Sequence, residues 1–189
     1  PNTGVSPVEL DRLPNLSGVA DVIYNPEKTA LILDAQARGI PAVSGLTMLV
    51  AQAREADEWF FNRPVPGEVV RTICGEIRAE MLNLVLVGMP GCGKSTLGAQ
   101  VAALLNRPFE DCDEEIVREA GKSIPEIFAR FGETDFRRRE AEVLRRVGRE
   151  SGTVVATGGG AILREDNGRA LRQNGRGCFL RRPLEQLPT

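Results

Sequence analysis

The residues whose types and spacing most clearly indicate a chemical role lie between residues 82 and 105. An apolar stretch at 82–87 predicts a buried strand, the pattern Gly-x-x-x-x-Gly-Lys-Ser follows at once, and an apolar-periodic segment at 96–105 predicts a helix. In this strand–loop–helix order the pattern predicts a phosphate-binding loop. Its glycines let backbone amides turn towards an anion, and the helix N-terminus adds partial positive charge. The residues expected to bind a nucleotide triphosphate are Gly91, Cys92, Gly93, Lys94, Ser95 and Thr96.

Two carboxylates, Asp111 and Asp113, follow the predicted loop and helix. They are two residues apart, and on an extended segment such side chains point the same way. We expect Lys94 to reach the β- and γ-phosphates and the Ser95 hydroxyl to ligate Mg²⁺. One carboxylate would hold Mg²⁺ through water, and the other would accept a hydrogen bond from a hydroxyl that attacks the γ-phosphate. The alternative is that Asp113 only caps the helix expected at 114–120 and Asp111 lies at the surface.

Two further features could bind a substrate. A glycine triplet directly follows a strand predicted at 153–157, which suits a ligand close to the main chain, although a flexible turn is the alternative. The triplet consists of Gly158, Gly159 and Gly160. The planar guanidinium of Arg137 suits the bidentate capture of a carboxylate. Spacing alone does not distinguish Arg137 from Arg138 or Arg139, and a solvated ion-pair face with nearby acids is expected for the other arginines.

Strands alternate with helices from residue 81 onwards. Such alternation predicts an α/β fold with a parallel sheet covered by helices on both faces. A capping box at Ser123 and Glu126 predicts a helix start, and Phe131-Gly132 predicts a break before a long helix at 133–150. Ligands of such sheets gather at the carboxyl ends of the strands. The phosphate loop, the two carboxylates and the glycine triplet all follow strand ends, so we expect one crevice to collect them.

The N-terminal third of the chain predicts a small, separate α/β segment. Its pattern favours short strands at 19–24 and 41–44 and helices at 29–38 and 46–61. Residues 63–80 are expected to form a linker, because two prolines and a glycine open the stretch and mixed charge closes it. The predicted domains are therefore 1–62, the linker 63–80 and a second domain at 81–189.

Composition excludes several kinds of site and partner. The net charge of −2 and the lack of a strong basic run argue against nucleic-acid binding. The chain has no histidine, and its four cysteines show no C-x-x-C spacing, so a zinc site and a histidine-based triad are not expected. No apolar stretch approaches 18 residues, so no membrane association is expected. Unpaired thiols favour a reducing cytoplasm, and we expect a cytoplasmic monomer.

Taken together, the motifs resemble the shikimate kinase family over residues 82–183. The matching motifs are Gly91-Cys-Gly-Lys-Ser-Thr96, Asp111-x-Asp113, Phe136-Arg137 and Thr157-Gly-Gly-Gly-Ala161. The resemblance implies a P-loop kinase-type fold, ATP and Mg²⁺ as cofactors, and transfer of the γ-phosphate of ATP to the 3-hydroxyl of shikimate. It implies that Lys94 and Asp113 are catalytic, with Asp113 as the base that also binds ring hydroxyls. It further implies that Asp111 assists Mg²⁺, that Arg137 binds the shikimate carboxylate and that the glycine triplet meets the substrate.

Residues 1–62 resemble the C-terminal end of shikimate dehydrogenase. The resemblance rests on Tyr24-Asn-Pro and on the stretch from Gly45 to Gln52. It implies that Tyr24 and Gln52 touch shikimate and that Gly45 lies by a nicotinamide. The family's catalytic Lys and Asp come earlier in its sequence, and no G-x-G-x-x-G occurs in this chain. We therefore expect a remnant without dehydrogenase activity, in which Tyr24 and Gln52 only pack against helices.

Two alternative functions and one hypothesis about the parent protein follow from these resemblances. The chain ends near the point where the kinase family has a mobile lid with an arginine, so a catalytically impaired nucleotide-binding fragment is one expectation. The order of the two resemblances suggests a bifunctional dehydrogenase–kinase parent. Another small P-loop kinase of the gluconate type is the runner-up, although Asp113, Arg137 and the glycine triplet favour a cyclic polyol that bears a carboxylate.

Overall fold

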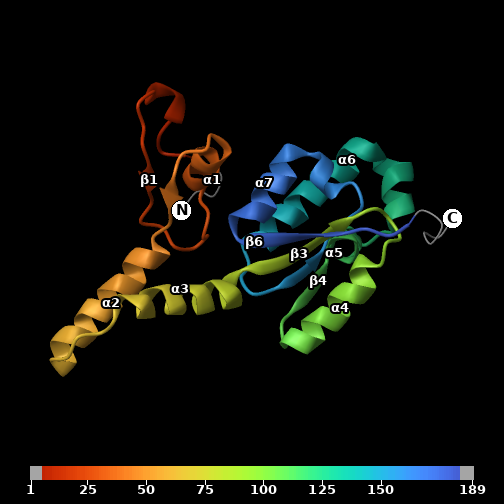
Figure 1. Ribbon diagram of the computed structural model, residues 1–189. Coiled ribbons are helices and arrows are strands. Elements are labelled where there is room, and N and C mark those ends of the chain that lie inside the picture. Colours follow the sequence, from red (N-terminus) through yellow and green to blue (C-terminus); the bar gives the residue numbers. More distant parts are fainter. Residues whose placement is uncertain (1–5, 184–189) are drawn as a thin grey trace. The chain divides into compact units, whose positions relative to one another are not determined.

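The computed structural model describes residues 6–183. It divides into two compact units, Pro1–Met81 and Leu82–Thr189 (Figure 1). Among the described residues, no helix combines the length and the apolar character that a membrane span needs.

The N-terminal unit is a small α/β assembly. Its elements are η1 (Leu10–Arg12), β1 (Val19–Ala20), α1 (Ala30–Ala37), β2 (Ala42–Val43), α2 (Leu46–Phe61) and α3 (Gly67–Met81). The two short strands pair in parallel, with Val19 opposite Ala42. The predicted helices at 29–38 and 46–61 are confirmed, whereas the two strands are shorter than predicted.

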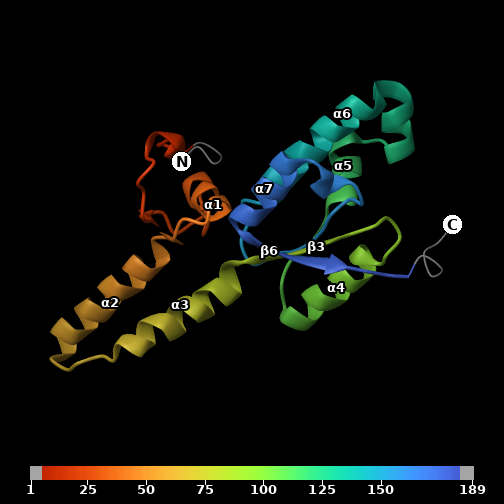
Figure 2. The ribbon, with the colours of Figure 1, turned by 45° about the horizontal axis from the view of Figure 1, so that its top comes forward.

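The predicted linker at 63–80 is wrong over most of its length, because α3 occupies residues 67–81. Val70, Cys74 and Ile77 recur at the spacing of one helix face, and they pack against Leu46 and Val50 of α2. Figure 2 shows α2 and α3 side by side, joined by a short turn. The prolines that suggested a linker lie at this turn. The apolar residues that recur after them form one face of α3, so the rest of the stretch is helical.

The C-terminal unit is built on a four-stranded parallel sheet. Its elements are β3 (Asn83–Gly88), α4 (Lys94–Leu105), β4 (Phe109–Asp111), α5 (Cys112–Ala120), α6 (Ile124–Val147), β5 (Val154–Ala156), η2 (Ala161–Leu163), α7 (Glu165–Gln173) and β6 (Gly175–Leu180). The strand order is β4-β5-β3-β6, and every pairing is parallel. Leu84 of β3 lies opposite Val154 of β5, and Gly88 lies opposite Leu180 of β6.

Helices cover both faces of this sheet, as the α/β prediction required (Figure 1). On one face, Leu86 and Val154 pack with Ala102 of α4. On the other face, Val85 and Val155 lie in the main core with side chains of α5, α6 and α7. Strands that are buried on both faces read as continuous apolar runs, which is why 82–87 and 153–157 were recognisable from sequence.

A buried asparagine fixes the start of β3, the strand that carries the phosphate loop. The side-chain amide of Asn83 donates hydrogen bonds to the carbonyl oxygens of Val147 (3.3 Å) and Glu150 (2.7 Å). Its side-chain oxygen accepts a hydrogen bond from the Thr153 amide (2.9 Å). A buried polar side chain is tolerated when its donors and acceptor are satisfied. Asn83 thereby ties the start of β3 to the connection between α6 and β5.

Two helix starts decide where functional side chains point. Asp111, rather than Asp113, is the N-cap of α5, because its Oδ1 accepts hydrogen bonds from the amides of Asp113 (2.9 Å) and Glu114 (3.4 Å). The prediction that Asp113 caps this helix is therefore wrong. The capping box of Ser123 and Glu126 at the start of α6 is confirmed, and so is the break at Gly132, whose φ of 78° is not helical.

Candidate active site

The phosphate loop connects β3 to α4 as predicted. Gly91 and Gly93 have positive φ values of 72° and 93°, which a residue with a side chain adopts only with strain. The ammonium group of Lys94 folds back over the loop and donates hydrogen bonds to the carbonyl oxygens of Gly88 (2.9 Å) and Met89 (2.8 Å). The Lys94 side chain is largely buried, with the residue 7% exposed. The loop thus presents glycine backbone and one buried cation at the carboxyl end of β3.

Ser95 and Asp111 meet at the base of this loop. The Ser95 hydroxyl donates a hydrogen bond to Oδ2 of Asp111, while Oδ1 of Asp111 caps α5. A hydroxyl and a carboxylate oxygen in contact are ligands that suit Mg²⁺, which binds through one or two protein oxygens plus phosphates and water. Within residues 6–183 no cluster of three or more His, Cys, Asp or Glu side chains could hold a metal by itself. The contact between Ser95 and Asp111 fits a metal ion that shares its ligands with a polyphosphate.

The Asp113 carboxylate also lies within the electrostatic reach of Lys94 and Asp111, but not for the predicted reason. Asp113 lies in the first turn of α5 rather than on an extended segment, so the expected alternation with Asp111 does not apply. Its Oδ1 lies 2.9 Å from the position that a Cβ on Gly158 would occupy. Burial raises the pKa of Asp113, and the negative charges of Asp111 and Glu140 raise it further, while Lys94 and Arg137 act in the opposite direction.

Each glycine of the triplet allows a different close approach. A Cβ on Gly158 would meet Asp113, and a Cβ on Gly159 would lie 2.4 Å from Cγ of Pro90 in the phosphate loop. A Cβ on Gly160 would lie 3.2 Å from Nη1 of Arg137. The triplet is therefore closely packed against the loop, the acid and the arginine. It brings these three features together at the carboxyl ends of the strands, where the sequence predicts one crevice.

The structure distinguishes Arg137 from its neighbours, which spacing did not. Arg138 and Arg139 both donate to the Asp135 carboxylate, at 2.7 and 2.6 Å. Arg137 instead donates through Nη1 to both oxygens of Glu140, at 3.0 and 3.2 Å. Its guanidinium is the one that lies beside Gly160. Arg137 is therefore the arginine of this run that belongs to the crevice.

Glu140 is a residue of the crevice that sequence reasoning missed. The sequence predicts a solvated ion-pair face for the acids near these arginines, whereas Glu140 is only 2% exposed. Its carboxylate lies beside Gly158, and its charge raises the pKa of Asp113. The hydrogen bond from Arg137 compensates this buried charge and raises the pKa of the guanidinium. The signal in the sequence was the spacing of three residues from Arg137, which places both side chains on one helix face.

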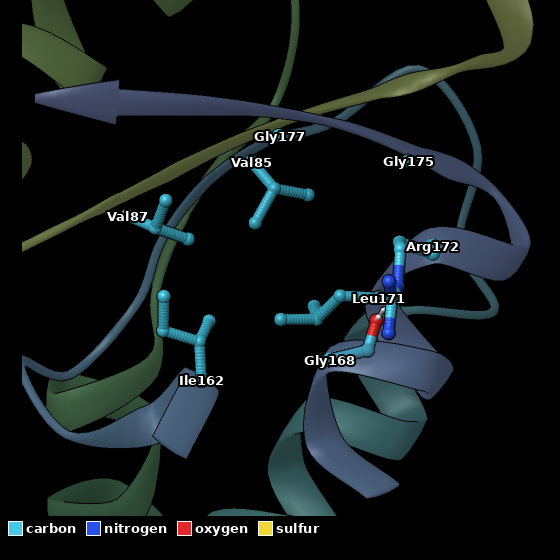
Figure 3. Close-up of a pocket in the computed structure, with 8 residues that line it drawn as sticks. All are labelled: Val85, Val87, Ile162, Gly168, Leu171, Arg172, Gly175 and Gly177. Carbon is cyan, nitrogen blue, oxygen red and sulfur yellow. Dashed lines mark hydrogen bonds between the residues drawn. The ribbon is translucent and has the colours of Figure 1, made fainter. Parts of the chain in front are cut away.

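A second hollow of about 280 Å³ lies on the sheet face beneath α7 (Figure 3). It is lined mainly by apolar and glycine residues, including Val85, Val87, Ile162 and Leu171, with Arg172 as its charged member. None of the predicted site residues lines it. Its apolar lining does not suit a phosphate or a polyol, so it is distinct from the crevice described above.

The three positions to which the dehydrogenase resemblance assigns roles, Tyr24, Gly45 and Gln52, differ in burial. Gly45 is buried, and a Cβ there would lie only 2.0 Å from the carbonyl oxygen of Val22. Its amide donates to the carbonyl oxygen of Ile23 (3.0 Å) at the start of α2. Tyr24 and Gln52 are both exposed. Close backbone packing accounts for Gly45, and the dehydrogenase roles of all three residues stay predictions.

Comparison with known proteins decides the family. A sequence model of the family described as "Shikimate kinase" matches residues 90–189, more than half of the chain. The chain belongs to the shikimate kinase family. Among curated relatives, the shikimate kinase of Nitrosomonas europaea is 49% identical over 105 residues, which cover 56% of this chain and 50% of that protein. The shikimate kinase of Pseudomonas syringae pv. tomato is 46% identical over 106 residues, which cover 56% of this chain and 62% of that protein.

Solved shikimate kinases share the fold of the C-terminal unit. The enzyme from Acinetobacter baumannii, solved in complex with shikimate, is 42% identical with a TM-score of 0.56, and the match covers 59% of this chain and 62% of that one. The enzyme from Aquifex aeolicus is 38% identical with a TM-score of 0.53 and matches 55% of this chain and 62% of its own. The chain thus spans about half to three fifths of the length of these relatives.

Proposed function

We propose that the protein transfers the γ-phosphate of ATP to the 3-hydroxyl of shikimate, giving shikimate 3-phosphate for aromatic amino acid synthesis. The observation that carries this proposal is the position of the Asp113 carboxylate. It faces a glycine triplet that packs against the phosphate loop at one residue and against Arg137 at another. The triplet therefore joins three groups that the reaction needs: the phosphate loop for ATP, Asp113 to orient an alcohol, and Arg137 to bind a carboxylate. Membership of the shikimate kinase family supports the same assignment.

Phosphoryl transfer requires alignment and charge neutralisation more than covalent chemistry from the protein. The backbone of the phosphate loop and the Lys94 ammonium would bind the β- and γ-phosphates. Lys94 donates to loop carbonyls at 2.8 and 2.9 Å, and these hydrogen bonds hold its ammonium group at the loop. Its charge then meets the incoming phosphates with little rearrangement.

Asp113 would accept the proton of the attacking hydroxyl. Burial and the nearby carboxylates raise its pKa, which makes its carboxylate a stronger base than an exposed aspartate. The site therefore combines an acid that is costly to ionise with cations that favour ionisation, namely Lys94 and Arg137. Arg137 would bind the shikimate carboxylate, and Glu140 would hold its guanidinium in place. Gly159 and Gly160 would meet the substrate through their backbone.

Mg²⁺ is proposed as the cofactor of the reaction. Ser95 and Asp111 are the residues that would hold it, because their oxygens already meet at the base of the loop. The ion would supply charge neutralisation at the phosphates. We also propose that the protein is a cytoplasmic monomer that acts on a small molecule and not on nucleic acid. The net charge of −2 argues against nucleic-acid binding, and the unpaired cysteines favour a reducing compartment.

The test is a coupled assay of ADP release by this chain with ATP, Mg²⁺ and shikimate, beside Lys94→Ala. We expect release that depends on shikimate and that Lys94→Ala reduces at least a hundredfold, since one buried cation is lost from the charge that stabilises the transition state. Thermal-shift titrations with shikimate and with gluconate identify the acceptor. Nucleotide binding without shikimate-dependent ADP release, or stabilisation by gluconate alone, would refute the proposal.

A further inference from the structure

Two arginines at the end of β6 take no part in the site described so far. Arg181 and Arg182 directly follow β6, whose register places Leu180 opposite Gly88, the first glycine of the phosphate loop. The backbones are close there, since a Cβ on Gly88 would lie 2.6 Å from the carbonyl oxygen of Leu180. β6 ends beside the loop that joins β3 to α4 (Figure 1). The chain therefore places two consecutive cations next to the start of the phosphate loop.

These cations differ from the other charged groups of the crevice. Both side chains are exposed, and neither forms an ion pair with a partner among residues 6–183. Arg137 is held by Glu140, and Lys94 donates to loop carbonyls. Within residues 6–183, an anion could therefore bind Arg181 and Arg182 without displacing an ion pair.

The two flanks of the phosphate loop carry opposite kinds of charge. On the β5 side lie the carboxylates of Asp111, Asp113 and Glu140, with Arg137 beside Glu140. On the β6 side, the two residues that follow the strand are both arginines. A nucleoside triphosphate is strongly anionic, so the β6 flank is the favourable side for the part of it that does not react.

The geometry of phosphoryl transfer assigns a role to this flank. The attacking and leaving oxygens lie roughly in line through the transferred phosphorus. The acceptor residues Asp113, Arg137 and Gly160 all come from the side of β3 on which β4 and β5 lie. The leaving diphosphate must therefore extend away from them, which is towards the strand on the other side of β3. That strand is β6.

We infer that Arg181 and Arg182 bind the diphosphate portion of the nucleotide and so contribute to the affinity for both ATP and ADP. The inference rests on the proposed kinase function and extends it to two residues outside the motifs. A guanidinium binds phosphate oxygens through paired hydrogen bonds, and at an exposed position the contribution depends on salt.

The experiment measures nucleotide binding to the full chain by calorimetry, with ADP, ATP, AMP and inorganic triphosphate as probes. The test variant is Arg181→Gln/Arg182→Gln. The matched control is Arg145→Gln/Arg149→Gln, which removes the same charge from two exposed arginines near the C-terminal end of α6. That end precedes β5, so the control arginines lie at the opposite, amino-terminal edge of the sheet.

We expect the test variant to bind ADP, ATP and inorganic triphosphate about tenfold more weakly than the wild type, with a reduced salt dependence. AMP binding is expected to change less than twofold, because AMP lacks the diphosphate. The control variant is expected to bind all four probes as the wild type does. Arg181→Lys/Arg182→Lys should restore most of the affinity, because it restores the charge.

The outcomes separate this inference from the proposed function. If the wild type binds ATP and Lys94→Ala weakens that binding, but the test variant behaves like the control, the inference is wrong and the kinase proposal stands. An equal loss for AMP and ADP would also overturn it, because contact with the nucleoside or its first phosphate would then explain the effect. A wild type that binds none of the nucleotides would overturn both.

Discussion

The two units of this chain bury different kinds of side chain. The C-terminal unit buries Lys94, Asp111, Glu115 and Glu140, together with several uncharged polar groups. Among the described residues of the N-terminal unit, every buried side chain is apolar. Burial of a charge costs free energy unless partners compensate it, so a fold retains such groups where chemistry requires them. The contrast supports our proposal that the chemistry of the chain belongs to the C-terminal unit.

Their apolar cores differ as well. The main core of the C-terminal unit joins side chains from both central strands and three helices. The core between α2 and α3 contains only Leu46, Val50 and Cys74 as buried members. At the end of α2, Trp59 is 88% exposed and Phe60 is 84% exposed. The N-terminal unit therefore has less buried apolar area to stabilise it.

The sharpest test of this contrast is Asp113→Asn, in which the chemistry and the stability of the C-terminal unit should move in opposite directions. Loss of the base should reduce shikimate-dependent ADP release by about 10²- to 10⁴-fold. Stability in metal-free buffer at pH 7 should increase, because burial and the neighbouring carboxylates raise the pKa of Asp113 above its ordinary value of 3.8 and so disfavour its charge. The measurements are the coupled assay and urea unfolding.

The pH dependence follows from the sign of this shift. The folded protein binds the proton of Asp113 more tightly than the unfolded chain, so wild-type stability falls as pH rises through the interval between the two pKa values. The gain from Asn should therefore be largest above the folded pKa and vanish below pH 3.8. Asp57→Asn, on the exposed surface of the N-terminal unit, is the control. A loss of stability at pH 7 in Asp113→Asn would contradict the argument.

A matched pair of core substitutions tests the two apolar clusters. Leu144→Ala in the main core should cost about 4 kcal/mol, and Leu46→Ala between α2 and α3 should cost about 2 kcal/mol, since a small cluster can collapse around the missing atoms. Hydrogen exchange read by mass spectrometry assigns each loss to its unit. Equal losses in the two units would show that the cores are equally constrained.

Glu140→Gln tests whether the buried acid positions Arg137. Loss of the charged partner should raise the KM for shikimate about tenfold and change kcat less, because the guanidinium is no longer held for the substrate carboxylate. Glu140 also raises the pKa of Asp113, so the acid limb of the pH–rate profile should move to lower pH. Glu142→Gln, whose acid pairs with Arg138 at the surface, is the control. An unchanged pH profile would exclude the electrostatic part of this role.

The smallest expected effect concerns the capping box of α6. Ser123→Ala should reduce stability slightly at pH 7, because the side-chain hydroxyl that donates to Glu126 is lost while the backbone amide of residue 123 can still donate. These hydrogen bonds lower the pKa of Glu126 below 4.5, so their contribution is present above that pH and is lost as pH falls through the folded pKa. The difference from wild type should narrow in acid. Thr134→Ala, at an exposed helical position, should not lose stability.

What could be predicted from sequence was whatever depends on neighbouring residues. The phosphate loop is contiguous, and its strand and helix flank it directly, so residues 82–105 were predicted closely. The capping box and the break at Gly132 are equally local. The linker at 63–80 failed because two prolines and a glycine were given more weight than the apolar period of Val70, Cys74 and Ile77.

What depends on distant packing was not predictable in the same way. Glu140 looked like one acid among several on a charged helix, and only the fold shows that it is buried beside Gly158. The convergence of Asp113 on the crevice was predicted, but through an extended geometry that the structure replaces with a helix turn. The resemblance to the family assigned roles to the motif residues. The burial of Glu140 could be seen only in the structure.

The two carboxylate oxygens of Asp111 connect the Ser95 hydroxyl to the first turn of α5. One oxygen accepts from Ser95 at the start of α4, and the other holds the first turn of α5, on which Asp113 lies. A ligand that draws the Ser95 hydroxyl away rebalances the hydrogen bonds of the same carboxylate. We therefore expect a ligand at Ser95 to alter the hydrogen bonds that hold the turn on which Asp113 lies.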